Sequence, residues 1–239
     1  MSAVTDPNKL GEIGLFCGLT PAQQSGLNEL LRRRTLPPAT TFIADEQPGE
    51  AVYLIVNGAV KVYLVDEEGE EVILAILTAG EVVGEMSLLD RNSRCANAVT
   101  LEETTVFWMD RAAFQECLRT MPAIQRNLTR LLCDRLRIAN ARIQSLAVQD
   151  VEGRVARQLL SFAEIYGRAA GGGEIVIPFR LTQSDLASLV GATRVRVNQI
   201  VSAYKQRRYL SVDQDYRITI HNREALSRRA QDQLCRRAA

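Results

Sequence analysis

The sequence predicts an α+β protein in which an antiparallel β-roll is followed by a long helix and then by a small domain of short helices and a hairpin. Three patterns support this architecture. Short apolar runs separated by turn residues fill residues 36–110, an apolar helical period begins after Pro122, and two short amphipathic segments flank Gly191. Several short strands separated by turns are typical of a closed antiparallel roll, whereas strands that alternate with helices would indicate a parallel sheet.

The β-roll is predicted from stretches such as AVYLIVNGAVKVYLVDEEGEEVILAIL, which begins at Ala51. Glycines lie at the turns between the apolar runs, 11 residues apart, at Gly58, Gly69 and Gly80. Glycine is the residue that turns with positive φ accept most readily, so these positions are expected to separate the strands. A short helical region over residues 10–34 is expected to precede the roll.

The long helix is predicted over residues 123–148. Its apolar positions recur at spacings of 4, 4, 3, 4 and 3 residues, at Leu128, Leu132, Leu136, Ala139, Ile143 and Leu146. Such a stripe packs either against the chain's own roll or, as a coiled-coil seam, against a second copy. A helix this long has little else to cover after a compact roll, so the second interpretation, a homodimer, is favoured.

Charge and capping signals divide the chain into three parts. Residues 1–120 form the predicted roll domain, residues 121–149 the long helix and hinge, and residues 150–239 the C-terminal domain, whose first helix is capped by Asp150. The first 150 residues carry 14 Lys+Arg against 20 Asp+Glu, whereas the remaining 89 carry 15 against 8. A basic C-terminal part joined to an acidic N-terminal part predicts a nucleic-acid partner for the former.

Several classes of protein are disfavoured by composition. The N-terminus has no basic-then-apolar signal and no window approaches 18 unbroken apolar residues, so a cytoplasmic protein without a membrane partner is expected. The five cysteines are scattered, at positions 17, 95, 117, 133 and 235, and His221 is the single histidine. These residues do not suit a disulfide framework, a metal, haem or iron–sulfur site, or His-dependent catalysis. We therefore expect no cofactor, no metal and no enzymatic activity.

One stretch, VVGEMSLLDRNSRCA at residues 82–96, is not explained as scaffold. Gly84 offers a bare backbone N–H ahead of a short helical turn, whose N-terminus favours an anion. Arg94 supplies a planar guanidinium that can hold a phosphate through two hydrogen bonds, and Glu85 can accept a hydrogen bond from a sugar hydroxyl. This set suits the ribose and phosphate of a nucleotide. The alternative is that Glu85 and Arg94 simply pair with each other.

The segment LTQSDLASLVGATRVRVNQIV predicts two helices joined by a turn at Gly191. Thr182 caps the first helix and Thr193 the second. The second helix has outward residues that suit base edges in a major groove, namely Arg194, Val195, Arg196, Asn198 and Gln199. An ordinary solvated helix is the alternative, although such a helix would more often carry mixed Glu and Lys. Arg217 follows a turn at residues 213–215 in a predicted hairpin wing, where it can contact phosphate.

These motifs resemble the cyclic AMP receptor protein and fumarate-nitrate reductase regulator superfamily of bacterial transcription factors. The matching segments are DEEG at 66–69, LTAG at 77–80, GEMSLL at 84–89, RCA at 94–96, DVEGRVARQLL at 150–160 and the helix-turn-helix segment. The resemblance covers about residues 15–222 and is specific, because ligand cassette, long helix and DNA-binding motif follow the order found in the family.

The resemblance implies a jelly-roll-like cyclic nucleotide-binding domain, a dimerisation helix and a winged helix-turn-helix. It further implies a homodimeric regulator whose binding to a palindromic double-stranded DNA operator is controlled allosterically by a cyclic nucleotide, with RNA polymerase as a further partner. The implied mechanism is a population shift in which the nucleotide bridges the roll to the long helix and reorients the DNA-binding domains about Asp150.

By position, Glu85 would accept from the ribose 2′-hydroxyl and Arg94 would bind the cyclic phosphate. The other implied ligand contacts are the backbone of Gly84 and Met86, the side chains of Ser87 or Cys95, Leu74 and Leu77 at the purine, and Asn140 on the long helix. Cys95 departs from the usual Ser or Thr, and a thiol is a weaker donor. Ala139 departs from the usual Thr and cannot supply a hydroxyl to the adenine. Cyclic AMP remains the first choice, with cyclic GMP or weak affinity as the alternatives. A second hypothesis is a constitutively active regulator with a vestigial pocket or a different effector.

The resemblance also assigns the DNA contacts, namely Thr182, Gln183, Thr193, Arg194, Val195, Arg196, Asn198, Gln199 and Arg217. Arg194 matches the family's principal guanine-reading arginine. Val195 stands where familiar members carry glutamate, and Gln199 stands where they carry a second arginine. The Arg194-Val195 pair instead resembles the nitrogen-control branch of the family. Val195 can pack on a thymine methyl and Gln199 can pair with adenine, so the family's best-known half-site is not assumed.

Overall fold

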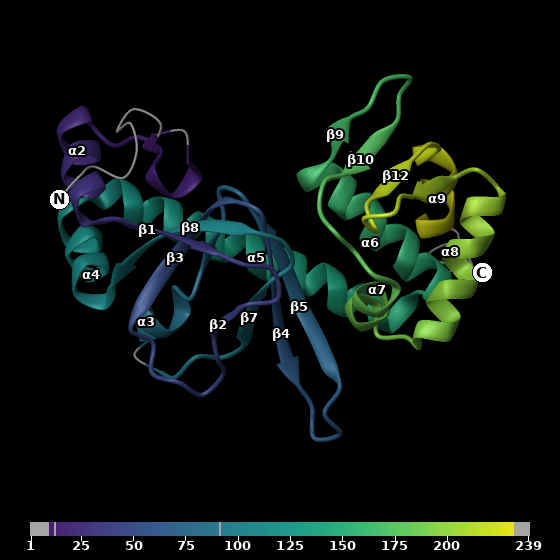
Figure 1. The fold of residues 1–239 in the computed structure, drawn as a ribbon, viewed down its shortest axis with the longest axis horizontal. Coiled ribbons are helices and arrows are strands. Elements are labelled where there is room, and N and C mark those ends of the chain that lie inside the picture. The colour runs from purple at the N-terminus through teal and green to yellow at the C-terminus, as the bar shows by residue number, and fades with distance from the viewer. Residues whose placement is uncertain (1–9, 12, 91, 232–239) are drawn as a thin grey trace. The chain divides into compact units, whose positions relative to one another are not determined.

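The computed structural model describes residues 10, 11, 13–90 and 92–231 (Figure 1). Strands predominate before the long helix and helices after it, as the sequence predicts for an α+β protein. None of the helices in this part of the chain has both the length and the apolar character that a bilayer crossing requires.

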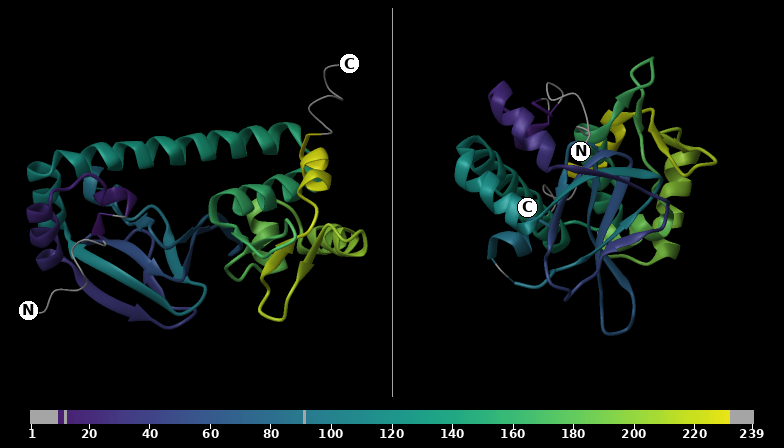
Figure 2. Two further views of the ribbon diagram at one scale, coloured as in Figure 1. Left: turned by 90° about the horizontal axis from the view of Figure 1, so that it is seen from above. Right: turned by 60° about the vertical axis from the view of Figure 1, so that its left-hand side comes forward.

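The chain divides into two compact units, the first within residues 1–64 and 74–137 and the second within residues 65–73 and 138–239. The long helix α5 (Pro122–Val148) contributes to both units and is one continuous helix of 27 residues (Figure 2). Its observed bounds confirm the helix predicted from the apolar period.

Among the described residues before α5, eight strands form two four-stranded sheets, in the orders β1-β8-β3-β6 and β2-β7-β4-β5. Their bounds are β1 Arg32–Leu36, β2 Thr41–Ile43, β3 Ala51–Asn57, β4 Ala59–Val65, β5 Glu71–Thr78, β6 Val82–Val83, β7 Asn97–Thr100 and β8 Thr104–Asp110. The registered pairs, such as β1 with β8 and β4 with β7, are antiparallel. Each strand contributes one side chain to a buried apolar cluster that joins the two sheets, made of Leu36, Ile43, Ile55, Val60, Leu77, Val83, Ala98 and Val106. This cluster is the interior of the predicted roll.

The predicted turn glycines have the backbone conformation that the turns require. Gly58, Gly69 and Gly80 have φ values of +95°, +85° and +91°. At Gly58, a Cβ atom would lie 2.5 Å from Oγ1 of Thr104 and 2.7 Å from the carbonyl oxygen of Glu103. Any larger residue there would collide with the start of β8, so this turn accepts only glycine.

Helices cover one face of the β1-β8-β3-β6 sheet. α2 (Pro21–Leu30), α4 (Arg111–Thr120) and the first turns of α5 bury apolar side chains against strands β3, β6 and β8, among them Leu27, Phe114 and Leu128. Full burial of a side chain of this size contributes about 1.5–3 kcal/mol, so this second cluster fixes the start of α5 on the roll.

The residues of the apolar stripe of α5 lie in two different environments. Leu128 is buried and Leu132 packs against the cluster under the sheet, whereas Leu136 is 62% exposed and Ile143 is 65% exposed. Packing on the chain's own roll, the alternative to a dimer seam, therefore holds for the N-terminal part of the stripe. It does not account for the part from Leu136 onward.

The helical region expected over residues 10–34 is shorter in the structure. α2 ends at Leu30, and Arg32 begins the edge strand β1, in register with Trp108 of β8. The guanidinium of Arg32 lies 5.1 Å from the Trp108 ring centroid. Pairing with β8 through long-range backbone hydrogen bonds outweighs the helical tendency of the three arginines. This pairing cannot be seen in the local sequence.

Up to residue 231, the second unit contains four helices after α5 and a small sheet in the order β11-β12-β10-β9. Their bounds are α6 Val151–Tyr166, β9 Arg168–Ala169, β10 Ile175–Ile177, α7 Gln183–Val190, α8 Arg194–Gln206, β11 Leu210–Val212, β12 Ile218–Ile220 and α9 Arg223–Gln231. Asp150 caps α6, as predicted, by accepting a hydrogen bond of 2.8 Å from the backbone N–H of Gly153. The rings of Phe162, Tyr166 and Phe179 pack against one another in the core. The unit is a helix-turn-helix with a hairpin wing, which confirms the predicted fold class.

Candidate ligand pocket and nucleic-acid interface

The candidate pocket begins where β6 ends at Gly84. This residue has a φ of +85°, and a Cβ atom there would lie 2.6 Å from Nη1 of Arg94 and 3.1 Å from Cδ1 of Ile43. Both the backbone conformation and the close approach of Arg94 therefore require glycine. The chain then turns into the short helix α3 (Met86–Asp90), as the sequence predicts.

Glu85 is the most deeply buried acidic side chain of the pocket, with only 1% of the residue exposed. Its Oε1 accepts a hydrogen bond of 2.5 Å from Nη1 of Arg135, which lies on α5. Nη2 of Arg135 also donates to the carbonyl oxygen of Val82. A buried carboxylate needs such a partner, because desolvation of an unpaired charge costs several kcal/mol. The interpretation in which Glu85 pairs with Arg94 is therefore wrong: its ion pair is with Arg135.

Arg94 is 8% exposed and is held by oxygen atoms of three different residues. Nη1 donates to the carbonyl oxygen of Gly84 at 2.6 Å and to Oγ of Ser87 at 2.9 Å, and Nη2 donates to the carbonyl oxygen of Ala51 at 2.6 Å. Burial lowers the pKa of the guanidinium from its ordinary value, yet an arginine remains charged at neutral pH. The structure thus places a fixed, nearly buried positive charge beside the turn at Gly84.

Ser87 and Cys95, the two candidate side chains beside the phosphate position, lie in different environments. Ser87 is buried and bonded to Arg94, whereas Cys95 is exposed. The sulfur of Cys95 lies 3.9 Å from the sulfur of Met86. Desolvation, followed by the negative charge of Glu85, raises the pKa of the Cys95 thiol, so this side chain is a neutral, weak donor at neutral pH.

The three residues predicted to contact the purine differ in their burial. Leu77 belongs to the buried cluster inside the roll with Ile43 and Val83, whereas Leu74 is exposed on the same strand β5. Asn140 lies on α5 and is exposed. The structure thus brings Gly84, Glu85, Met86, Ser87, Arg94 and Cys95 together around one turn. The roles of Leu74, Leu77 and Asn140 stay predictions.

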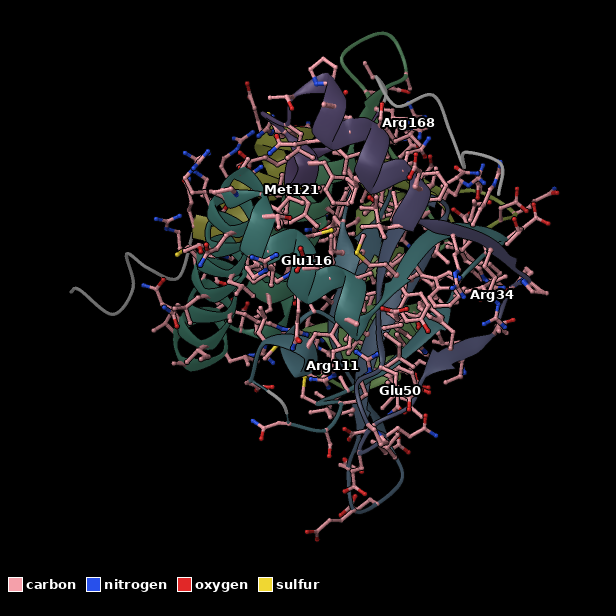
Figure 3. The ribbon with its side chains drawn as sticks, turned by 90° about the vertical axis from the view of Figure 1, so that its left-hand side faces the viewer. Arg34, Glu50, Arg111, Glu116, Met121 and Arg168 are labelled. Atoms are coloured by element: carbon pink, nitrogen blue, oxygen red, sulfur yellow. The ribbon has the colours of Figure 1, made fainter. Side chains whose placement is uncertain are left out.

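Two arginines of the pocket are absent from the sequence-based prediction. Arg135 pairs with Glu85, and Arg111 donates to the carbonyl oxygens of Gly49 and Ser87 at 3.0 and 3.1 Å. Figure 3 shows Arg111 beside the short helix α3. A buried glutamate signals that some cation must lie near it, but the sequence does not say which of the many arginines of α5 is adjacent.

The helix-turn-helix begins with the predicted capping box. Oγ1 of Thr182 accepts from the backbone N–H of Asp185 at 3.1 Å, and the Asp185 carboxylate accepts from the backbone N–H of Thr182 at 3.0 Å. At the other end of α7, Gly191 has a φ of +62° and forms the turn. Thr193 then caps α8 by accepting from the backbone N–H of Arg196 at 3.3 Å.

The second helix, α8, has one buried and one exposed face, as predicted. The buried face is formed by Val197, Ile200, Val201 and Tyr204. The exposed residues near its N-terminus are Arg194, Val195, Arg196, Asn198 and Gln199. Val195 is 68% exposed, which leaves it available to a partner. Gln183 of α7 donates to Asn198 at 2.9 Å, so the two helices present one joint polar surface.

The predicted wing is the hairpin of β11 and β12. Its turn is organised by Asp213, whose Oδ1 accepts from the backbone N–H of Asp215 at 2.9 Å and of Arg217 at 2.8 Å. Arg217 is exposed and immediately precedes β12. In the part of the chain that the structure describes, no three His, Cys, Asp or Glu side chains are grouped so that they could hold a metal ion.

Two protein-family models match the chain: the Cyclic nucleotide-binding domain over residues 33–121 and the Crp-like helix-turn-helix domain over residues 153–229. A relative from Mycobacterium tuberculosis, named CRP-like cAMP-activated global transcriptional regulator, is 34% identical over 221 residues, which cover 92% of this chain and 98% of the relative. The chain belongs to the CRP-like family of transcription regulators. The CRP-like chain is thus a DNA-binding regulator with a cyclic nucleotide-binding domain and not an enzyme.

Other relatives and solved structures are consistent with membership of the CRP-like family. The Cyclic AMP receptor protein of Thermus thermophilus is 32% identical over 189 residues, covering 79% of this chain and 84% of that protein. The solved structure of the Thermus thermophilus Catabolite Activator Protein matches with a TM-score of 0.51 at 28% identity, covering 92% of this chain and 99% of that one. FixK2 from Bradyrhizobium japonicum matches with a TM-score of 0.71 at 23% identity, covering 82% and 96%, and supports the fold alone.

Proposed function

We propose that this protein is a homodimeric transcription regulator whose DNA binding is controlled by cyclic AMP. The observation that supports the proposal is that a buried arginine, Arg94, and a buried glutamate, Glu85, both lie at the turn of Gly84, whose φ of +85° favours glycine. A cyclic nucleotide is an anion with a ribose hydroxyl beside its phosphate, so a cation for the phosphate and a hydrogen-bond acceptor for the hydroxyl suit it.

In the proposed complex, Arg94 binds the cyclic phosphate and Glu85 accepts from the ribose 2′-hydroxyl. Ser87, whose Oγ already lies 2.9 Å from the Arg94 guanidinium, and the backbone of Gly84 and Met86 complete the phosphate site. Cys95, with its raised pKa, contributes at most a weak hydrogen bond. Leu74 and Leu77 line the purine.

The choice of cyclic AMP over cyclic GMP rests on Asn140 and on the relatives. An asparagine amide both donates and accepts, which suits the adenine edge, although Ala139 cannot add the hydroxyl that many family members have there. The relatives from Mycobacterium tuberculosis and Thermus thermophilus carry cyclic AMP in their names, which supports the same choice. Cyclic GMP is the alternative ligand.

The proposed DNA partner is a palindromic double-stranded operator read by α8. Arg194 forms two hydrogen bonds with guanine, Gln199 pairs with adenine and Val195 packs on a thymine methyl. The remaining contacts to bases and phosphates are made by Thr182, Gln183, Thr193, Arg196, Asn198 and Arg217. In a symmetric dimer the two α8 helices enter major grooves about 34 Å apart.

The proposed dimer seam is the exposed part of the α5 stripe. Leu136, Ile143 and Leu146 are all large, exposed apolar side chains at the spacing of a coiled-coil seam. A second copy of the same helix covers each of them with an identical stripe. We assign residues 1–120 to the nucleotide-binding domain, 121–149 to the dimerisation helix and hinge, and 150–239 to the DNA-binding domain.

Two further assignments follow from the proposed role. A transcription regulator must reach its operator, so in a bacterium it is cytoplasmic, and RNA polymerase is the natural further partner for a DNA-bound regulator. No cofactor is proposed. The nucleotide acts as an allosteric effector, which binds and dissociates without being chemically changed.

The test is calorimetric titration of the purified protein with cyclic AMP and, in parallel, with cyclic GMP. Micromolar binding of cyclic AMP with weaker binding of cyclic GMP is the expected result. If neither produces heat and the melting temperature does not move with either, the pocket is vestigial and the second candidate, a constitutively active regulator or one with a different effector, replaces the first.

A further inference from the structure

Three polar side chains meet on one face of the small sheet in the second unit. His221 immediately follows β12, Glu174 immediately precedes β10, and Ser211 lies in the middle of β11. Ile220 of β12 is in register with β10 on one side and with β11 on the other. One residue further along, His221 therefore lies opposite Glu174 and diagonally across from Ser211. Such neighbours share a face of the sheet, where long side chains can reach one another.

The three side chains form a continuous line of hydrogen bonds. Nδ1 of His221 lies 2.7 Å from Oε1 of Glu174, and Nε2 lies 2.9 Å from Oγ of Ser211. An ionised carboxylate can only accept a hydrogen bond, so Nδ1 of His221 carries the proton and donates to it. In the neutral imidazole Nε2 is then an acceptor, and the Ser211 hydroxyl must donate to it.

This is the arrangement in which a serine is activated as a nucleophile. A base within hydrogen-bond reach of the hydroxyl, itself oriented by a third group, is the geometric signature of nucleophilic activation on unrelated folds. Ser211 is exposed, so a small reagent can reach its oxygen. Leu210 and Ile220 are paired across β11 and β12 and are buried, so the core of the unit holds the strands in register. The hydrogen-bonded line is therefore both fixed by the fold and open to solvent.

Solvent sets the strength of this activation. The side chains of His221 and Glu174 are 29% and 42% exposed. A positioned general base typically contributes about 100- to 10,000-fold to a rate, and water competes for the same hydrogen bonds at an exposed site, so the lower end applies here. We therefore expect a single transfer to the protein itself, without turnover, as suits a regulator that is not an enzyme.

The charge of the surrounding unit favours an anionic reagent. Residues 151–239 carry 15 Lys+Arg against 8 Asp+Glu, and such an excess of positive charge raises the local concentration of small anions. An acyl phosphate is an anion whose carbonyl carbon is already activated, because phosphate is a good leaving group. Small acyl phosphates thus combine the charge and the reactivity that this site requires.

We propose that Ser211 is a site of acyl modification by small acyl phosphates, with His221 as the general base and Glu174 as a positioning residue. The Ser211 oxygen bonds to the carbonyl carbon while the bond from that carbon to the phosphate oxygen breaks. The hydroxyl proton passes to Nε2 of His221 and then to the departing phosphate, so the products are acyl-serine and inorganic phosphate. The modified side chain can no longer donate to His221, which frees the imidazole from β11, the first strand of the wing. This modification is independent of nucleotide binding and so goes beyond the proposed function.

The experiment is incubation of the full-length protein with acetyl phosphate at neutral pH, followed by peptide mass spectrometry. The rate of acetylation is measured at Ser211 and at Ser184, an exposed serine on α7 that serves as the matched control. Ser211 is expected to react at least about tenfold faster than Ser184. In His221→Gln, whose amide keeps a hydrogen-bonding group but is not a base, the rate at Ser211 is expected to fall to that of Ser184. Glu174→Gln is expected to lower it about two- to fivefold, as loss of an exposed ion pair implies.

Two further readouts separate general-base assistance from a purely structural role of His221. Thermal melting of each variant shows whether the sheet is intact, and a slower reaction in D₂O is expected in the unmodified protein but not in His221→Gln. Equal rates at Ser211 and Ser184 in the unmodified protein overturn the inference, even if a variant fails to fold. Fast acetylation of Ser211 that persists in His221→Gln overturns the role of His221. Neither result bears on cyclic AMP binding, which calorimetry measures separately.

Discussion

The pocket around Gly84 and the exposed face of α8 hold their polar side chains in opposite ways. In the pocket, Arg94 and Glu85 are almost fully buried and already bonded to protein partners. On α8, Arg194 and Val195 project from the surface. A buried, preorganised charge loses little freedom when it binds an anion, whereas an exposed side chain must be ordered by its partner. Under the proposed function, we therefore expect the buried side chains of the pocket to contribute mainly affinity for the nucleotide, and the exposed side chains of α8 to contribute mainly discrimination among DNA sequences.

The largest effect is expected where a buried charge is removed. Arg94→Leu eliminates the charge-assisted hydrogen bonds that we propose for the phosphate, so we expect cyclic AMP affinity to fall at least about 100-fold. Calorimetry measures the loss, and thermal melting shows whether the roll still folds. Arg119→Leu is the control, since that arginine forms only an exposed pair with Glu116 on α4. Normal affinity in Arg94→Leu would remove the phosphate role from this residue.

The dimer seam is expected to be the next most sensitive feature. In the Ile143→Asp variant, each of the two copies places one negative charge in the proposed seam. The lost apolar burial should weaken association by about 2–4 kcal/mol per dimer. Sedimentation should then show monomers at concentrations where the unmodified protein is dimeric. Ile165→Asp is the matched control, because Ile165 is also an exposed isoleucine, on α6. Equal dissociation in the two variants would argue against α5 as the seam.

A smaller and more selective effect is expected on α8. Arg194→Ala should cost about 1–3 kcal/mol on the operator and little on random DNA, because a bidentate contact to guanine distinguishes sequences and a phosphate contact does not. Competitive binding assays at one fixed salt concentration measure both losses. If the two losses are equal, Arg194 contacts the phosphate backbone.

The smallest effect is expected on the free energy of unfolding, when the Glu85 partner Arg135 is replaced and compared with a second arginine of α5. Arg135→Ala leaves the buried Glu85 without its ion-pair partner. Because the Arg135 side chain is itself 30% exposed, water can replace part of the lost interaction, and the free energy of unfolding should fall by about 1–2 kcal/mol. Arg137→Ala breaks an exposed pair with Asp134 and should change it by less than about 0.5 kcal/mol. Urea denaturation of both variants provides the comparison, and equal losses would show that burial of Glu85 does not matter.

Local signals in the sequence predicted the features that depend on neighbouring residues. The capping box of Thr182 and Asp185, the cap at Asp150, the turn at Gly191 and the bounds of α5 are all confirmed. Each follows from hydrogen bonds or periodicity within a few residues, which a single sequence displays directly.

Long-range contacts account for what the sequence did not predict. The partner of Glu85 lies 50 residues away at Arg135, and Glu174 lies 47 residues before its partner His221. The strand identity of Arg32 likewise depends on β8. The stripe of α5 has one spacing throughout, so its division into buried and exposed parts follows only from where the roll ends.

The most direct test of ligand-controlled DNA binding is selection from a random double-stranded DNA library with and without cyclic AMP. We expect recovery of a palindromic site whose half-sites are about one helical turn apart, bound at least tenfold more tightly when cyclic AMP is present. Recovery of the same site with equal affinity in both conditions would contradict control by cyclic AMP. Recovery of no site in either condition would contradict the DNA-reading role of α8.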